Sequence, residues 1–338
     1  MIKNVSIRNF KSIKKLDFKA RRVNVFIGEP NTGKSNILEA LGMFSLVYSK
    51  SPHEVPIRYQ DASNLFYDND VYNCIPHVKA DDYSYQITHN DQSGHTSLFA
   101  TLREGADPGE EAMFDFDLKN RVRGSFINEE EEFYGLPRYF IRLYQFKILK
   151  KYQGFGQFLN PPFGDNLFEV LSTNKELRNI VSSLFTKQGY RLGLRQGDKK
   201  IEATKLIDDL LYSYPYQTIS DSLQRVIFYS AIIATNKNST ILLEEPESHM
   251  SPYYIRDIAN RIAHDTNNQY FLVTHNPYFL VTLVEKTKLS DLSVSVTYLD
   301  DYQTKLKQLT KKDLEEVTDL DTSIFFNLDK FTEVESIV

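Results

Sequence analysis

The sequence predicts an α/β fold with a mixed sheet flanked by helices, an N-terminal antiparallel β part and a mostly helical insert. Short apolar runs typical of buried parallel strands occur at 23–27, 241–243 and 270–273. The first run leads into a glycine-bearing loop and then into residues with helical spacing, 35–41. Stretches of alternating polar and apolar residues at 5–8 and between 51 and 98 indicate antiparallel sheet.

The middle of the chain has a different character. From Phe133 to about Phe185 the spacing is helical and rich in aromatic residues, with a turn at 160–164. Strong helical periodicity returns at 218–235. We therefore expect helices to dominate the segment between the two α/β ends of the chain.

The composition of the chain argues against several functional classes. A net charge of −5 argues against a whole-surface grip on nucleic acid but leaves room for a local basic groove. The lone Cys74 excludes an intrachain disulfide and a thiolate zinc cluster, which favours a reducing compartment. No apolar run approaches the roughly 18 residues of a membrane span, and the N-terminus lacks a signal-peptide core. A cytoplasmic location without membrane contact is the simplest expectation.

The strongest motif is Gly28–Ser35, which matches G-x-x-x-x-G-K-[ST] between a strand and a helix. Glycines let backbone N–H groups turn toward phosphates, and the helix N-terminus adds partial positive charge. Lys34 reaches the β- and γ-phosphates, and the Ser35 hydroxyl binds Mg²⁺. The predicted nucleotide-binding residues are Gly28, Glu29, Pro30, Asn31, Thr32, Gly33, Lys34, Ser35 and Asn36.

Two further strands end in polar residues. The run 240–243 delivers Glu244 and Glu245 to the C-terminal edge of a sheet, where one carboxylate can hold Mg²⁺ and the other polarise water. By itself such a pair is more often a helix cap or a solvated turn, but a P-loop in the same chain reverses these odds. The run 271–273 leads to His275, which could hydrogen-bond the γ-phosphate or the attacking water, although a lone histidine is usually structural.

Together these segments resemble the ATP-binding cassette ATPases of the SMC/RecF/OLD group, and within it the compact AAA family ATPases often found in prokaryotic defence systems. The resemblance rests on residues 7–12, 26–41, 219–225, 242–252 and 274–276. It implies a P-loop NTPase fold of the ABC-ATPase head type. OLD-type relatives also carry a Toprim nuclease domain, but too few residues follow His275 for one here, and Asp319-Leu320-Asp321 lies in a predicted turn.

The resemblance also implies roles for single residues. Glu244 occupies the Walker B position, Glu245 that of the catalytic base and His275 that of the switch histidine, with Lys34 completing the catalytic set. The stretch from Ser220, including Ser222, corresponds to the signature helix that caps a partner's ATP. Gln60 is a candidate for the Mg²⁺-sensing Gln loop, although an exposed loop amide is an equal alternative. The sequence departs from the pattern of this group at three places. Walker B has Glu244 where many members have Asp, the signature segment lacks its glycines, and Ser251 stands where the Asp of the D-loop is expected.

The insert contains basic and aromatic residues of the mixture seen in nucleic-acid grooves. We favour the alternative of an amphipathic helix with solvated Lys and Arg over a buried aromatic stripe. The residues concerned are Arg138, Arg142, Lys147, Lys150 and Lys151 with Tyr139, Tyr144 and Tyr152.

We therefore expect an ATPase lobe with the Walker A motif at 1–98, a mostly helical insert or lid at 99–214, and at 215–338 a lobe with the signature-like helix, Walker B, switch histidine and C-terminal tail. The expected activity is Mg²⁺-dependent ATP hydrolysis by a homodimer or higher homo-oligomer. Nucleotide-driven dimerisation would act on DNA or on a partner effector protein. The alternative is a slow-hydrolysing, ATP-locked scaffold or sensor that recruits an effector such as a nuclease.

Overall fold

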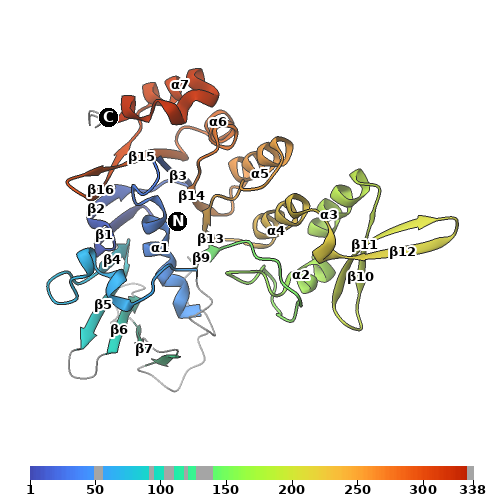
Figure 1. The fold of residues 1–338 in the computed structure, drawn as a ribbon, viewed down its shortest axis with the longest axis horizontal. Helices are drawn as coiled ribbons and strands as arrows, with labels where there is room; N and C mark the ends of the chain where they lie inside the picture. Colours follow the sequence, from blue (N-terminus) through green and yellow to red (C-terminus); the bar gives the residue numbers. More distant parts are fainter. Residues whose placement is uncertain (49–55, 91–94, 103–109, 118–120, 127–139, 333–338) are drawn as a thin grey trace.

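The computed structural model describes residues 1–48, 56–90, 95–102, 110–117, 121–126 and 140–332 (Figure 1). Its centre is a six-stranded sheet in the order β16-β15-β3-β14-β13-β9. Five of these strands are parallel, and only β16 runs antiparallel to its neighbour. The strands are β3 (Val23–Gly28), β9 (Phe140–Tyr144), β13 (Ser239–Glu244), β14 (Gln269–Val273), β15 (Leu292–Asp300) and β16 (Gln303–Gln308).

Both faces of the central sheet are covered, which explains why β3 and β14 are buried along their whole length. One face packs against α1 (Lys34–Gly42) and the N-terminal sheet, with Phe26 and Phe271 in this layer. The other face packs against α4 (Asp221–Thr235), α5 (Pro252–His264) and α6 (Pro277–Lys286). The apolar runs in the sequence are therefore buried parallel strands, as predicted.

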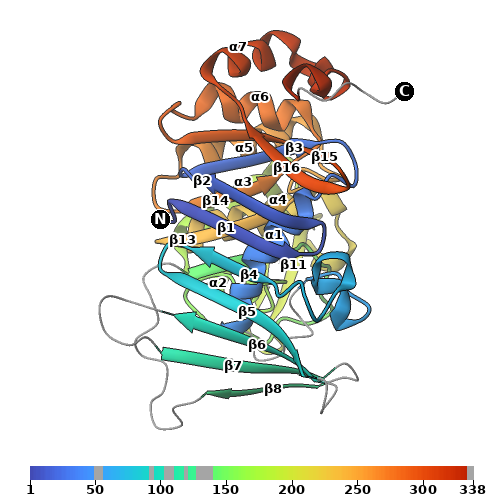
Figure 2. The ribbon, with the colours of Figure 1, turned by 90° about the vertical axis from the view of Figure 1, so that its left-hand side faces the viewer.

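The N-terminal sheet is antiparallel, with seven strands in the order β2-β1-β4-β5-β6-β7-β8 (Figure 2). This confirms the predicted N-terminal antiparallel part, and the sheet continues past residue 98. Its strands are β1 (Asn4–Phe10), β2 (Ile13–Lys19), β4 (His77–Ala80), β5 (Tyr83–Asn90), β6 (His95–Leu102), β7 (Glu110–Asp117) and β8 (Arg121–Phe126).

The rest of the described chain is an arm and a C-terminal layer. The arm holds α2 (Leu167–Thr173), α3 (Lys175–Lys187) and the antiparallel strands β10 (Arg191–Arg195), β11 (Lys200–Ile207) and β12 (Leu210–Pro215), which project to one side (Figure 1). At the C-terminal end, α7 (Lys311–Leu320) lies beside α6. Short 3-10 helices are Met43–Tyr48, Ala62–Leu65, Tyr67–Asn69, Tyr216–Thr218, Asp321–Phe326 and Leu328–Phe331.

The expectation of a mostly helical insert is wrong for the described part of 99–214, where α2 and α3 are the two helices and strands account for most of the regular structure. The aromatic spacing that we interpreted as helical includes β9, whose residues pair in parallel with β13. Aromatic and aliphatic residues suit a buried strand as well as a helix, so spacing over a short window did not separate the two.

The predicted amphipathic helix carrying the basic residues is also wrong. Arg142 lies on β9 and is buried, with its guanidinium 3.5 Å from the centre of the Phe158 ring and hydrogen-bonded to Asn236. Tyr144 is fully enclosed and donates a hydrogen bond to the Leu159 carbonyl. Lys147, Lys150 and Lys151 are exposed on the loop that follows, and Tyr152 is buried. Arg138 and Tyr139 lie outside the described residues.

The stacked pair of Phe26 and Phe271 gives a test of the central layer. Their ring centres lie 6.4 Å apart with an interplanar angle of 20°, and Phe271 is fully buried. We expect Phe271→Ala to lower the free energy of unfolding by about 3–5 kcal/mol, measured by chemical denaturation. The control Tyr302→Ala, at a residue that is 90% exposed, should change it by less than about 0.5 kcal/mol. Equal effects of the two substitutions would contradict this packing.

Candidate functional site

The site lies at the edge of the central sheet where three neighbouring parallel strands end. In the sheet β3 pairs with β14, and β14 pairs with β13. Phe26 stands opposite Val273, and Val273 stands opposite Glu244. The loop after β3, the carboxylates after β13 and the histidine after β14 therefore meet at one edge, where open α/β sheets bind ligands.

The loop from Gly28 to Ser35 has the backbone that its two glycines permit. Gly28 has φ of 153° and Gly33 has φ of 90°, both in the region that favours glycine. A Cβ atom at Gly28 would collide with Thr297, and one at Gly33 would collide with Thr304. Helix α1 begins directly after Gly33, and no side chain of the described residues caps its N-terminus. The first N–H groups of α1 thus face the loop without a side-chain acceptor, as an anion site requires.

Lys34 is enclosed by this loop. Its Nζ donates hydrogen bonds to the carbonyl oxygens of Gly28, at 2.9 Å, and Glu29, at 2.5 Å. Burial lowers the pKa of the Lys34 ammonium to about 8, against the opposing effect of the nearby carboxylates, of which Glu245 and Glu244 act most. The loop therefore holds a cation that is poorly solvated and ready to exchange carbonyl oxygens for stronger anionic acceptors.

The other predicted loop residues divide into anchored and exposed ones. Thr32 Oγ1 donates to the Glu29 carbonyl at 2.8 Å and contacts the Thr297 hydroxyl. Asn36 Nδ2 donates to Ser12 Oγ at 2.7 Å, on the turn between β1 and β2. Glu29, Pro30 and Asn31 are exposed at the tip of the loop. The side chains of Thr32 and Asn36 hold the loop against the sheets, which leaves the backbone as its ligand-facing part.

Ser35 and Glu244 form the part of the site that suits a divalent cation. The Ser35 hydroxyl donates a hydrogen bond to Glu244 Oε1, so two hard oxygen atoms lie side by side. Among the described residues, no group of three or more His, Cys, Asp and Glu is placed to hold a metal. Two protein oxygens fit Mg²⁺, which usually keeps several waters and binds substrate phosphates.

An ion cluster that we did not predict flanks this pair. Arg58 Nη2 lies 3.9 Å from Glu244 Oε1, and Arg58 Nε lies 2.6 Å from Glu39 Oε1. Lys11 also binds Glu39, whose side chain is only 2% exposed. Arg58 lies in an irregular segment without a motif, so the sequence carries no signal for it. The cluster ties α1 to the N-terminal sheet and places a guanidinium beside the carboxylates.

Glu245 and His275, which follow β13 and β14, are brought close to each other. Glu245 has φ of 44°, in the left-handed region that a glutamate rarely adopts, and its N–H donates to the Val273 carbonyl at 2.9 Å. Its Oε1 lies 3.7 Å from His275 Nε2, and its Oε2 accepts a hydrogen bond from Ser248. Burial and then the Lys34 charge lower the pKa of His275, against the charge of Glu245. This backbone turn points the two adjacent glutamates at different neighbours.

Glu247 is a second residue to which we gave no role from the sequence. Its side chain is buried, and its Oε1 accepts hydrogen bonds from the Thr274 hydroxyl and from the His275 N–H at 3.3 Å. Its Oε2 has no hydrogen-bond partner among the residues that the structure describes. Burial raises the pKa of Glu247 to about 7. This carboxyl group links the segment after β13 to the segment after β14 and fixes the backbone of His275.

Three predicted residues are not brought to the loop within one chain. Ser220 caps α4 by accepting a hydrogen bond from the Leu223 N–H, and Ser222 Oγ accepts one from the Ser251 N–H at 3.2 Å. Gln60 is exposed, and its backbone N–H donates to Asn64 Oδ1. In the described part of the chain no hydrogen bond joins Gln60 to Ser35 or Glu244, so its role as a Mg²⁺ sensor remains a prediction.

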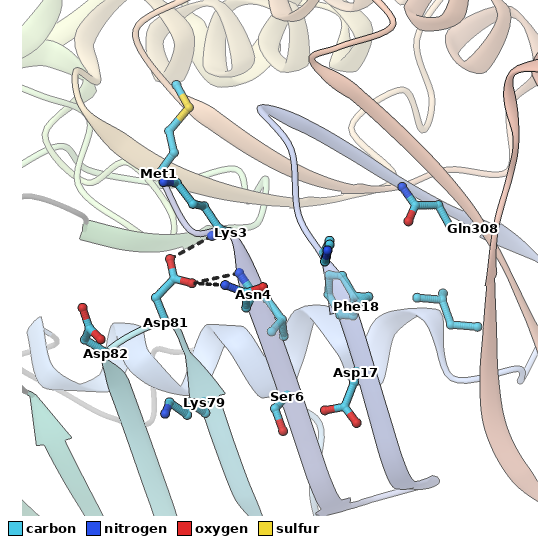
Figure 3. A pocket seen from close by; sticks show the side chains of 13 residues that line it. Met1, Lys3, Asn4, Ser6, Asp17, Phe18, Lys79, Asp81, Asp82 and Gln308 are labelled. Atoms are coloured by element: carbon cyan, nitrogen blue, oxygen red, sulfur yellow. Dashed lines mark hydrogen bonds between the residues drawn. The ribbon is translucent and has the colours of Figure 1, made fainter.

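A separate hollow lies elsewhere, over β1, β2 and β16 (Figure 3). Its volume is about 1000 Å³. Lys3, Lys19 and Lys79 are balanced there by Asp17, Asp81 and Asp82. Asp81 already accepts hydrogen bonds from the backbone of Lys3 and Asn4 at 2.8 Å (Figure 3). Because its charges are balanced and Asp81 is satisfied by the backbone, this hollow does not compete with the loop as a phosphate site.

Comparisons with known proteins agree with this architecture. The family model described as "AAA domain, putative AbiEii toxin, Type IV TA system" matches residues 23–281. A crystal structure of the SmcHead bound to the C-winged helix domain of ScpA matches with 13% identity, covering 93% of this chain and 99% of that one, with a TM-score of 0.50. An SMC head domain from Thermotoga maritima matches with 12% identity, 91% and 99% coverage and a TM-score of 0.42.

The SmcHead likeness shows a shared fold: a P-loop ATPase head with a mixed sheet flanked by helices. No curated protein matches the chain. Among the described helices, none combines the length and apolar character that crossing a bilayer demands.

The protonation of Glu247 predicts a pH-dependent stability. Its pKa rises from 4.5 to about 7 on folding, so the folded state holds the proton more tightly and loses stability as pH rises between these values, by about 3 kcal/mol in total. We expect Glu247→Gln to remove this loss, so that its stability relative to the wild type is greater above pH 7 than below pH 4.5. Denaturant unfolding at both pH values measures it, with the exposed Glu285→Gln as the control. An unchanged pH dependence would contradict a buried, protonated Glu247.

Proposed function

The chain belongs to this AAA-domain family of ATP-binding P-loop proteins, and we propose that it hydrolyses ATP with Mg²⁺. The observation that carries the proposal is the convergence of Lys34, Ser35, Glu244, Glu245 and His275 at one sheet edge. Each of the three strands contributes a different chemical group: a cation and hydroxyl, two carboxylates, and an imidazole. Phosphoryl transfer needs this combination of positioning and charge more than covalent chemistry.

Binding would begin with the loop. The N–H groups at the start of α1 would donate hydrogen bonds to the phosphate oxygens, and Lys34 Nζ would exchange the carbonyls of Gly28 and Glu29 for the β- and γ-phosphates. A charged acceptor forms stronger hydrogen bonds than a carbonyl, which favours the exchange. The phosphate charge also raises the pKa of Lys34, so the bound form keeps the lysine protonated.

Ser35 Oγ and Glu244 Oε1 would hold the cation together with phosphate oxygens and water. A bound Mg²⁺ would supply positive charge for the charge that develops on the phosphates during transfer. Arg58 and Lys34 add positive charge beside Glu244 and Glu245. For Gln60 we keep the proposal that follows from the sequence alone, a role in sensing Mg²⁺ as part of the Gln loop.

Hydrolysis would depend on Glu245. Its carboxylate lies beside His275, whereas Glu244 is hydrogen-bonded to Ser35, so Glu245 can accept the proton of the attacking water while Glu244 stays with the cation. His275 lies at the same end and can hydrogen-bond the γ-phosphate or the water. Glu247 would act as a positioning residue, since it holds the backbone N–H of His275.

We further propose that ATP closes a homodimer in the cytoplasm, in which the N-terminal end of α4 covers the partner's γ-phosphate. Ser220 and Ser222 stand at that end, and the hydrogen bond from the Ser251 N–H to Ser222 joins it to the start of α5. The closed dimer would act on DNA or on a partner effector protein in a DNA-related or defence function. The division of the chain into three parts, with boundaries at residues 98 and 214, is likewise a proposal.

A second function is favoured by one observation. The signature-like segment has no glycine, and its Ser222 hydroxyl is already an acceptor within its own chain. A bulkier and engaged helix end would hold the partner's phosphate less closely and slow turnover. The protein would then be an ATP-locked scaffold or sensor that recruits an effector such as a nuclease.

The first test separates the two carboxylates. Glu245→Gln should keep ATP binding and slow hydrolysis by at least about tenfold, because an amide cannot take the proton of the attacking water. Phosphate release and titration with a fluorescent ATP analogue measure the two effects. Lys34→Ala is the control that should lose binding itself. If Glu244→Gln stops hydrolysis while Glu245→Gln does not, the two assignments are reversed.

The second test concerns the dimer. Ser222→Arg should weaken ATP-driven association and turnover and spare ATP binding, because it places a long side chain where the partner's phosphate would lie. Sedimentation in the Glu245→Gln background, with and without ATP-Mg²⁺, measures the gain in mass. Ser222→Ala removes the bond to Ser251 without adding bulk and should retain most of the gain. No gain with ATP, and turnover unaffected by Ser222→Arg, would show that the site works alone.

A further inference from the structure

The hairpin of β11 and β12 exposes an apolar surface at the end of the arm (Figure 1). Every residue of β12 is exposed. Six apolar or aromatic side chains of the hairpin have exposed fractions between 36% and 69%: Leu206, Ile207, Leu210, Leu211, Tyr212 and Tyr214. The register places Ile207, Leu210, Tyr212 and Tyr214 on one face of the hairpin and Leu206 and Leu211 on the other. Exposed apolar side chains gathered in this number mark interaction sites on soluble proteins.

The edge of this small sheet is open on the β12 side. The strand order is β10-β11-β12, so within the described part of the chain β12 has a neighbour on one side only. The opposite edge strand, β10, begins with Arg191 and ends with Arg195, charges of the kind that protect an edge from pairing. In contrast, residues 210–214 carry no charge, and Pro215 stands only at the end of β12. The sequence protects one edge and leaves the other available.

The turn of the hairpin sets which backbone groups of β12 are available. Asp208 and Asp209 both have positive φ, and Ile207 pairs with Leu210 across them, which is a two-residue hairpin turn. The pair that closes such a turn is hydrogen-bonded, and bonded and non-bonded pairs alternate from there. Leu210, Tyr212 and Tyr214 therefore bond to β11. The N–H and C=O groups of Leu211 and Ser213 point to the open edge.

We propose that β12 pairs antiparallel with β12 of a second copy of this chain, with Tyr212 on the two-fold axis. Leu211 then exchanges two hydrogen bonds with Ser213 of the second copy, and Ser213 does so with Leu211 of that copy. All of residues 210–214 are paired in this register. An axis at Leu211 would place Ser213 opposite Asp209 in the turn, and an axis at Ser213 would place Leu211 opposite Pro215, which has no N–H.

The charge and the symmetry of this edge favour a second copy as the occupant. A two-fold axis brings identical segments together, and an uncharged β12 places no like charges opposite one another. Pairing at this edge gives acceptors and donors to the outward N–H and C=O groups of Leu211 and Ser213 and covers the flanks of the apolar side chains beside them. The contact uses no residue of the nucleotide site, so it forms without ATP and stands apart from the proposed ATP-driven dimer.

Backbone chemistry gives the first experiment. In sedimentation at micromolar concentration without nucleotide, the wild type and Lys34→Ala should both be dimers. Ser213→Pro removes one outward N–H and should weaken association at least about tenfold, whereas Ser213→Ala keeps it and should not. Binding of a fluorescent ATP analogue checks that both variants are folded. A wild type that is monomeric without nucleotide overturns the proposal, as does equal association of the two Ser213 variants.

Cysteine cross-linking tests the register. Opposed residues in a non-hydrogen-bonded pair have Cα atoms about 4.5 Å apart, within the range that a disulfide spans. In a Cys74→Ser background, Tyr212→Cys should form a disulfide-linked dimer under mild oxidation. Leu210→Cys and Tyr214→Cys should each stay largely unlinked alone and link when the two proteins are mixed. Self-linking of Tyr214→Cys as efficient as that of Tyr212→Cys would overturn the Tyr212 axis.

Discussion

The candidate site depends on the parallel pairing of β13, β14 and β3. These strands come from opposite ends of the chain, and their register alone brings Glu244, Val273 and the end of β3 to one level. Because successive side chains of a strand point to opposite faces, a slip of one residue would turn each of them to the wrong side. The buried layers on both faces, including the stacked rings of Phe26 and Phe271, make such a slip costly. Packing thereby fixes the geometry of the chemistry.

The strands and motifs of the head could be predicted because their signals are local. A buried run before Gly28 and helical spacing after Lys34 are contained within a few residues. The middle of the chain could not be predicted in the same way, since β9 becomes a strand only by pairing with β13. Arg142 reads as a solvated cation in the sequence, yet it is buried against Phe158. In both cases contacts with residues distant in the sequence determine the structure, and these contacts cannot be identified from a single sequence.

Within the site, the predicted residues were those of contiguous motifs, and the missed ones act across the fold. Glu39 joins Lys11 and Arg58 from three separate segments, and Glu247 binds Thr274 and His275 from the next strand. The left-handed backbone of Glu245 was also beyond prediction, because glutamate has no preference for it. That turn explains how two consecutive carboxylates serve different neighbours. A protonated Glu247 near neutral pH also limits the repulsion among three clustered acids.

The arm is joined to helix α4 by a short connection. Only the 3-10 turn Tyr216–Thr218 and two further residues separate the end of β12 from the start of α4. Tyr216 is buried, and its hydroxyl donates a hydrogen bond to the Gln224 carbonyl inside α4 at 3.2 Å. A displacement of the hairpin is therefore transmitted to α4 through a short connection that is held by this hydrogen bond. By thermodynamic linkage, a contact at the hairpin that favours one position of α4 changes the affinity for a ligand beneath that helix, and the ligand changes the hairpin contact by the same factor.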